Sequence, residues 1–177
     1  MISILLSKTL LAEKSKLTQI RLRRCSANEN KIGTTGTGWC VMKELRVIVA
    51  GSRDFNNYQL LSDKIMDYLE NIDDKNLIEN PKQIKFISGT ARGADVLGEQ
   101  FAYTWGYDVV RFPADWDGLG KRAGYVRNAE MAKYAIADGN YGVLIVFWDG
   151  KSKGTKHMID LAEKNGLEVH IVRFDNA

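Results

Sequence analysis

The chain has 177 residues, of which 45% are hydrophobic and 27% are charged, a composition typical of one globular domain and not of a disordered chain. No stretch approaches the roughly 18 consecutive apolar residues of a membrane-spanning helix. Two cysteines are too few for a disulfide framework, and neither has metal-ligand spacing. We therefore expect a cytoplasmic protein with no membrane partner and no metal site.

Residues 1–41 differ from the rest of the chain in charge. They hold seven Lys or Arg and two Asp or Glu, whereas the remainder holds eighteen basic and twenty acidic side chains. We interpret them as a poorly ordered basic extension or as sequence translated from a misassigned start. An amphipathic targeting peptide and a basic nucleic-acid-binding arm are the alternatives. Met42 is then the functional start of a single domain over residues 42–177.

Short apolar runs alternate with segments of helical periodicity from Leu45 onward. Residues 45–50 are apolar except for Arg46 and are followed by Gly51, which is typical of a strand buried on both faces. The predicted strands are residues 45–50, 84–87, 107–112, 141–148 and 168–173, and the predicted helices are residues 58–70, 94–105, 123–137 and 155–165. This alternation predicts an α/β, Rossmann-like fold: a doubly wound parallel sheet of about five strands in the order 3-2-1-4-5.

Glycine, hydroxyl and cationic residues follow three of the predicted strands, in the segments 51–55, 88–95 and 148–155. In a doubly wound sheet, ligands bind beyond the carboxyl ends of the strands where the strand order reverses, here between residues 45–50 and 141–148. Glycine lets a ligand approach the backbone, and N–H groups at a helix start attract anions. The loops therefore predict a phosphate- or nucleotide-binding edge, although neither G-x-x-x-x-G-K-[ST] nor G-x-G-x-x-G is present.

Four motifs in this part of the chain resemble the YspA-type, YpsA-related branch of the SLOG superfamily. They are Gly51-Ser52-Arg53-Asp54-Phe55, Ser88-Gly89-Thr90-Ala91-Arg92-Gly93-Ala94-Asp95, Arg127-Asn128-x-x-Met131 and Gly154-Thr155. That superfamily includes DNA-processing protein A and the cytokinin-activating lonely-guy hydrolases. The resemblance covers about residues 46–172 and implies a Rossmann-like protein of phage or bacterial type that binds a nucleotide or nucleotide-derived ligand.

One departure from the lonely-guy pattern concerns catalysis. Those hydrolases carry a P-G-G-x-G-T-x-x-E string whose glutamate helps to cleave an N-glycosidic bond. The matching stretch keeps Gly154-Thr155 but has Met158 in place of the glutamate. The resemblance therefore does not imply glycosidic hydrolysis by that residue.

The candidate ligand-binding residues lie in these motifs or beside the same strand ends. They are Gly51, Ser52, Arg53, Ser88, Gly89, Thr90, Arg92, Gly93, Asp95, Trp116, Arg127, Asn128, Trp148, Gly154 and Thr155. Arg53 and Arg92 are expected to bind phosphate, with bracing of the loops through nearby aspartates as the alternative. Asp95 begins a predicted helix, where a carboxylate either binds ribose hydroxyls or interacts only with the helix dipole.

Trp116 and Trp148 are candidates to stack on a base, and packing is the alternative for Trp148, which ends a strand. Arg127 and Asn128 are expected to face the ligand, with a surface pairing as the alternative. No catalytic residue is assigned. His157 is a candidate for acid–base chemistry, and Glu130 or Asp149 could assist hydrolysis, against the alternative of solvated surface groups.

The leading hypothesis for function is a binding module that acts as a sensor, carrier or sequestering protein for a nucleotide or nucleotide-derived ligand, without a cofactor and as either a monomer or a homo-oligomer. The first alternative is a hydrolase that cleaves a nucleotide at its glycosidic or phosphoanhydride bond. The second is a single-stranded DNA-binding protein. The net charge of −2 over residues 42–177 argues against DNA binding, because a domain with this charge lacks the positive surface that nucleic acid requires.

Overall fold

Parallel strands alternate with helices in the computed structural model, which describes residues 44–73 and 83–175. The strands are β1 (Leu45–Gly51), β2 (Ile84–Ser88), β3 (Asp108–Arg111), β4 (Tyr141–Trp148) and β5 (Glu168–Arg173). The helices are α2 (Tyr58–Asp73), α3 (Ala94–Trp105), α4 (Trp116–Leu119), α5 (Ala123–Ile136) and α6 (Lys153–Lys164), with the 3-10 turns η2 (Gly120–Arg122) and η3 (Ala137–Gly139). The predictions for residues 1–41 lie outside the described residues.

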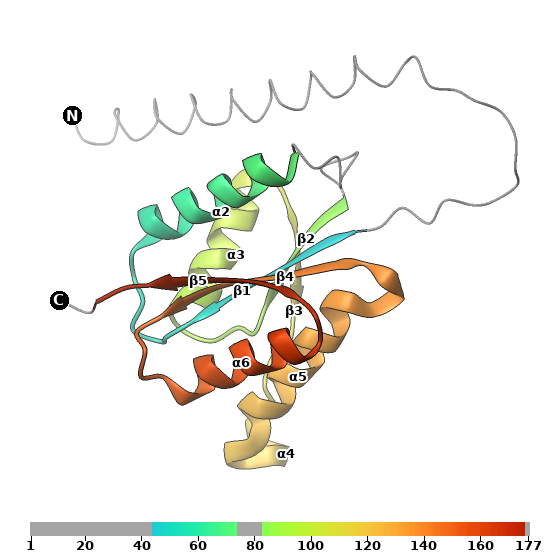
Figure 1. The fold of residues 1–177 in the computed structure, drawn as a ribbon. Helices are drawn as coiled ribbons and strands as arrows, with labels where there is room; N and C mark the ends of the chain where they lie inside the picture. The colour runs from blue at the N-terminus through green and yellow to red at the C-terminus, as the bar shows by residue number, and fades with distance from the viewer. Residues whose placement is uncertain (1–43, 74–82, 176–177) are drawn as a thin grey trace, which may run out of the picture. The chain divides into compact units, whose positions relative to one another are not determined.

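The five strands form one sheet in the order β3-β2-β1-β4-β5, and every neighbouring pair is parallel (Figure 1). β1 is the central strand, with Val47 in register with Phe86 of β2 and Val143 of β4. The predicted fold class and strand order are confirmed. The strand order reverses between β1 and β4, so the carboxyl ends of these two strands mark the expected ligand-binding edge.

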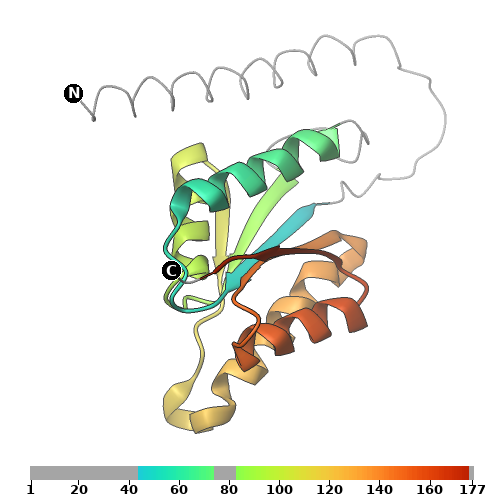
Figure 2. The ribbon, with the colours of Figure 1, turned by 60° about the vertical axis from the view of Figure 1, so that its left-hand side comes forward.

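Helices cover both faces of the sheet. Figures 1 and 2 show α2 and α3 on one face and α5 and α6 on the other, with α4 beyond the carboxyl ends of the strands. Because α3, α5 and α6 each follow a strand or its connection, their N-termini all lie at this same edge. None of the helices in the described part of the chain is long and apolar enough to cross a membrane.

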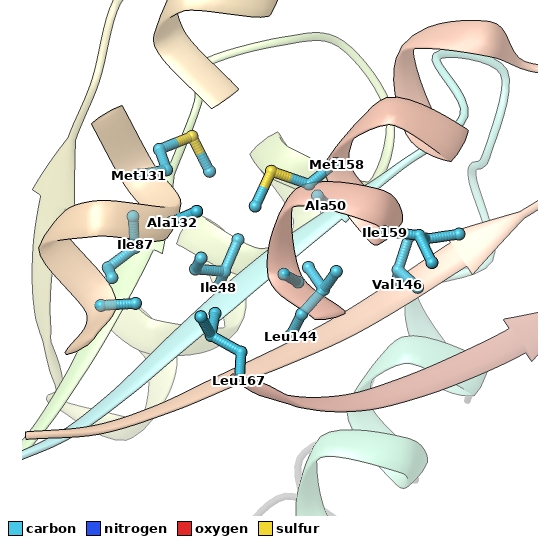
Figure 3. Packing of buried hydrophobic residues seen from close by; sticks show 12 residues of the cluster. Ile48, Ala50, Ile87, Met131, Ala132, Leu144, Val146, Met158, Ile159 and Leu167 are labelled. Atoms are coloured by element: carbon cyan, nitrogen blue, oxygen red, sulfur yellow. The ribbon is translucent and has the colours of Figure 1, made fainter. Parts of the chain in front are cut away.

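A hydrophobic core fixes α5 and α6 against the sheet (Figure 3). Ile48 of β1 and Leu144 of β4 pack with Met131 of α5 and Met158 of α6, and each of these side chains is at most 1% exposed. Burying one such side chain completely stabilises the folded state by roughly 1.5–3 kcal/mol. The core therefore holds the first turns of α5 and α6 in place beside the strand ends.

The structure differs from the predicted elements mainly at their ends. α6 begins at Lys153, before the predicted residue 155, because the Ser152 hydroxyl accepts a hydrogen bond from the Thr155 N–H and caps the helix. α5 ends at Ile136, where the chain continues into η3. Trp116, expected in a loop, begins the short helix α4, whose first turn is capped by the Asp115 side chain.

Candidate functional site

A pocket of about 310 Å³, called here the first pocket, lies at the carboxyl ends of the strands. Its walls come from the end of β1, the β2–α3 loop, α4 and the first turns of α5 and α6. The lining residues are Ala50, Gly51, Arg53, Ala91, Asp95, Trp116, Lys121, Gly124, Tyr125, Arg127, Asn128, Met131, Ser152, Gly154, Thr155 and Met158. The pocket thus combines apolar, hydroxyl and cationic groups at the point where the strand order reverses.

A second pocket, of about 370 Å³, adjoins the first over the β2–α3 loop. It is lined by Arg53, Gly89, Thr90, Ala91, Arg92, Ala114, Trp116 and Arg127. Four of these residues, Arg53, Ala91, Trp116 and Arg127, line both pockets. The two pockets are therefore neighbouring compartments that share one wall.

The shared wall is organised by the buried pair of Arg127 and Asp95. The Arg127 Nη1 lies 4.0 Å from the Asp95 Oδ2 and also donates a hydrogen bond to the Gly89 carbonyl. The Arg127 Nε donates to the Asn128 Oδ1 at 3.0 Å, and the Asn128 Nδ2 donates to the Gly154 carbonyl at 3.2 Å. This network connects the β2–α3 loop to α5 and to the start of α6, so it fixes three walls of the site relative to one another.

Burial controls the charge of this pair. Asp95 is only 4% exposed, and burial raises its pKa to about 6, although Arg127 and the N–H groups of Ala91 and Gly89 act to lower it. Burial lowers the pKa of Arg127 in turn, against the opposing effect of Asp95. A guanidinium keeps its proton in proteins, so Asp95 is the member of the pair that titrates near neutral pH. A carboxyl group with such a pKa in a pocket is a candidate functional group.

Two glycines of the second motif make this close packing possible. A Cβ on Gly89 would lie 2.2 Å from the Arg127 Nη1 and 2.8 Å from the Asp95 Oδ2. Gly93 has a φ of 84°, and a Cβ there would lie 2.4 Å from the Ser52 carbonyl oxygen. Gly89 therefore leaves room for the Arg127–Asp95 pair, and Gly93 lets the loops after β1 and β2 meet.

Thr90, on the wall of the second pocket, has a φ of 58°, in the left-handed region that residues with a Cβ rarely adopt. Its N–H donates to the Ser88 Oγ at 3.0 Å, and Ser88 is hydrogen-bonded in turn to Glu99. The Arg111 Nε donates to Glu99 at 2.9 Å. A chain of hydrogen bonds from β3 through α3 thus supports the strained residue, and such strain is common at ligand-binding sites.

The β4–α6 connection is held by contacts within the protein. The Trp148 indole donates to the Ser152 carbonyl at 3.2 Å, and the Arg173 guanidinium lies 4.1 Å from its ring centroid. The Asp149 carboxylate accepts the Ser152 N–H at 2.9 Å, and the Ser52 hydroxyl accepts the Asp149 N–H at 3.3 Å. Trp148, Asp149 and Ser52 therefore shape the turn that places the start of α6, and none of them lines either pocket.

The chain is similar to known proteins. The model of the YspA, cpYpsA-related SLOG family matches residues 45–118, from β1 to α4. The Gene 61 protein of Mycobacterium phage D29 is 34% identical in an alignment of 131 residues that covers 70% of this chain and 93% of the relative. The chain belongs to the YspA, cpYpsA-related SLOG family. This confirms the family resemblance seen in the motifs. No solved structure matches this SLOG protein.

The structure brings most of the predicted ligand-binding residues of the SLOG protein to the two pockets. Gly51, Arg53, Asp95, Trp116, Arg127, Asn128, Gly154 and Thr155 line the first pocket. Gly89, Thr90 and Arg92 line the second. Ser52, Ser88, Gly93 and Trp148 line neither and instead form the loops around them.

Several pocket residues were not predicted from the sequence. Lys121 and Tyr125 belong to the glycine-containing stretch 120–128 that begins α5, which was the signal that could have found them. Met131 and Met158 form the apolar wall, and both are also core residues. Met158 therefore lies on the pocket wall, so the position of the lonely-guy glutamate faces the site but carries no charge.

The residues considered for catalysis lie outside both pockets. Glu130 is exposed on α5, and the Asp149 carboxylate is used in the β4–α6 turn. His157 packs edge-on against Tyr125, with ring centroids 4.6 Å apart. Its Nδ1 is buried and has no hydrogen-bond partner among the described residues, and burial lowers the pKa of this imidazole. Within residues 44–73 and 83–175, no group of His, Cys, Asp and Glu is placed to hold a metal ion.

Proposed function

We propose that this SLOG protein binds a nucleotide or a nucleotide-derived ligand in the first pocket, as a sensor, carrier or sequestering protein. The observation that carries this proposal is the buried Arg127–Asp95 pair at the carboxyl ends of the strands, beside an apolar wall. A nucleotide is the class of ligand that needs a cation, a hydroxyl acceptor and an apolar surface within one small pocket. Family membership supports the same class of ligand.

Each part of a nucleotide has a matching group in the first pocket. Met131 and Met158 provide an apolar wall for a base, and Trp116, which is 51% exposed, provides an aromatic face on which a base can stack. The Asp95 carboxyl can accept hydrogen bonds from ribose hydroxyls. Arg127 presents a guanidinium for charge-assisted hydrogen bonds to the first phosphate.

Calorimetric titration with the four ribonucleoside monophosphates and the four triphosphates tests this proposal. We expect saturable binding of at least one of them, weakened about 10-fold or more by Arg127→Gln, because a hydrogen bond to a charged group contributes about 1.5–3 kcal/mol. Arg122→Gln is the matched control, since Arg122 is exposed and lines neither pocket. Circular dichroism checks that the variants are folded. Absence of binding for all eight nucleotides would reject the proposal.

A hydrolase is the second candidate, and one observation favours it. Asp95 is the only acidic side chain among the described residues that lines either pocket, and its pKa is raised to about 6, as suits a general acid or base. We place it second because Met158 offers no carboxylate to stabilise positive charge on the ribose, a contribution of roughly 100-fold or more in rate. Chromatography of the titration mixtures separates the two: release of free base or phosphate over many turnovers, lost in Asp95→Asn, would identify a hydrolase.

A further inference from the structure

The two pockets share a wall but differ in chemistry. The first has the apolar side chains of Met131 and Met158 and the ring of Tyr125. The second has none of these and is lined by Arg53, Arg92 and Arg127, with no acidic residue among the described residues. The first pocket therefore suits a base, and the second suits anions.

The positive charge of the second pocket is only partly balanced within the protein. Arg127 is paired with Asp95, but Arg53 and Arg92 are exposed, and neither forms an ion pair within residues 44–73 and 83–175. Burial lowers the pKa of Arg127, Asp95 opposes this, and the neighbouring charge of Arg53 lowers it further. Three arginines thus line one compartment, and of these only Arg127 is paired with a carboxylate of the described residues, which favours a ligand with more than one negative charge.

The volumes of the pockets also favour a ligand that extends beyond the first pocket. The first holds about 310 Å³ and the second about 370 Å³. Pockets for small molecules usually hold about 300–1,000 Å³, so the first alone is at the lower limit of that range. Because Arg53 and Arg127 line both pockets, these two residues lie where a ligand that spans the pockets would cross from one to the other.

We propose that the ligand carries a chain of two or more phosphates and lies across both pockets. The base and ribose occupy the first pocket, the first phosphate meets Arg127 at the shared wall, and the outer phosphates meet Arg53 and Arg92 in the second pocket. This inference rests on the proposed function and adds the direction in which the ligand lies and the number of phosphates. Arg92 is then the residue that distinguishes a polyphosphate from a monophosphate.

The experiment compares the monophosphate and the triphosphate of whichever base binds in the screen, by calorimetry with EDTA present so that no divalent cation bridges the ligand. We expect the triphosphate to bind at least about 10-fold more tightly, the lower limit for one hydrogen bond to a charged group. Arg92→Gln should remove about 10-fold in affinity for the triphosphate while leaving the monophosphate within about twofold, because the two nucleotides differ only in the outer phosphates. Arg122→Gln should leave both affinities unchanged.

Three results would overturn the inference while leaving nucleotide binding intact. The first is equal affinity for the monophosphate and the triphosphate. The second is equal weakening of both nucleotides by Arg92→Gln, which would place Arg92 at the first phosphate. The third is a loss of triphosphate affinity with Arg122→Gln as large as that with Arg92→Gln, which would indicate attraction by net charge alone. Failure of every nucleotide to bind would reject the proposed function itself.

Discussion

Asp95 and Arg127 are the residues whose arrangement is hardest to explain by stability alone. Their closest charged atoms are 4.0 Å apart, and their side chains are 5% and 11% exposed. Removing two charges from water at this distance costs more than their attraction returns unless other hydrogen bonds compensate, so a buried pair is weak evidence for stability. The hydrogen bonds with Gly89, Asn128 and Ala91 supply this compensation, so the pair is tolerated at the pocket where we expect a ligand to bind.

The raised pKa of Asp95 makes a specific prediction about pH. Its pKa is about 6 in the folded protein and 3.8 ordinarily, so between these values the folded state binds more protons than the unfolded state. Asp95 therefore lowers the free energy of unfolding as pH rises from about 4 to about 7, by up to about 3 kcal/mol. Urea unfolding at pH 4, 5, 6 and 7 measures this in the wild type and in Asp95→Asn, which cannot titrate.

The comparison with Asp95→Asn isolates this carboxyl group from the others. Glu44, Glu99 and Asp149 have pKa values lowered in the folded protein, so they lose stabilisation as pH falls and mask the effect of Asp95 in the wild type alone. These groups are common to both proteins. The free energy of unfolding of Asp95→Asn, relative to the wild type, should therefore rise with pH. A difference that stays constant from pH 4 to pH 7 would contradict the prediction.

At the scale of elements, the strands and long helices were predictable because burial imposes a pattern on their sequences. β1 and β4 are central strands, and their largely apolar sequences, interrupted in β1 by Arg46, reflect cover on both faces. α4 was not predicted because a helix of four residues has no periodicity, and its cap, Asp115, also suits a loop. The predicted start of α6, residue 155, lies two residues after the observed one, because Ser152 caps the helix from a stretch of polar residues that is also typical of a loop.

The site was only partly predictable for a related reason. Glycine, hydroxyl and cationic residues after parallel strands pointed to the edge of the sheet where the two pockets lie, since all the strands end there. Met131 and Met158 could not be distinguished from ordinary core residues, because an apolar side chain on the inner face of a helix packs in the same way whether or not it borders a pocket. Conversely, Gly93 lies in a motif and Trp148 at a strand end, but both serve the loops themselves.

The contact between β1, β4 and α3 supplies a prediction about packing. A Cβ on Gly51 would lie 2.3 Å from the Phe147 carbonyl oxygen and 2.8 Å from the Ala94 Cβ. Backbone in the centre of a sheet cannot move away cheaply, so Gly51→Ala should destabilise the protein by about 1–3 kcal/mol, the usual cost of overpacking. Urea unfolding at pH 7 measures the change.

Gly154→Ala is the matched control for Gly51→Ala. Gly154 lies in the first turn of α6, and nothing lies within 4 Å of a Cβ there. Because alanine favours a helix over glycine by up to about 1 kcal/mol, this variant should be as stable as the wild type or slightly more stable. Equal stability of the two variants would show that the sheet yields at Gly51 and that the close approach is not a constraint.

At the scale of the whole molecule, one topological feature determines where function can lie. Each parallel strand ends at the same edge, and the helices that begin there bring Asp95, Arg127 and Gly154 together from three separate parts of the chain. The hydrophobic core shown in Figure 3 stabilises the sheet domain, and two of its side chains, Met131 and Met158, also form the apolar wall of the first pocket. The fold therefore places the polar groups that we expect to contact a ligand at one edge of the sheet, next to the end of the core.

The last prediction concerns the removal of residues 1–41, whose basic composition differs from that of the sheet domain. Glu44 already connects the start of β1 to its neighbours: its N–H donates to the Asn140 Oδ1 at 2.8 Å, and its carbonyl accepts the Tyr141 N–H at 2.9 Å. A shortened chain that begins at Met42 keeps these bonds and the whole core, so its melting temperature should stay within about 2 °C of the full chain, a change below about 1 kcal/mol. Calorimetric unfolding of both proteins measures this, and a fall of about 10 °C would show that residues 1–41 belong to the folded domain.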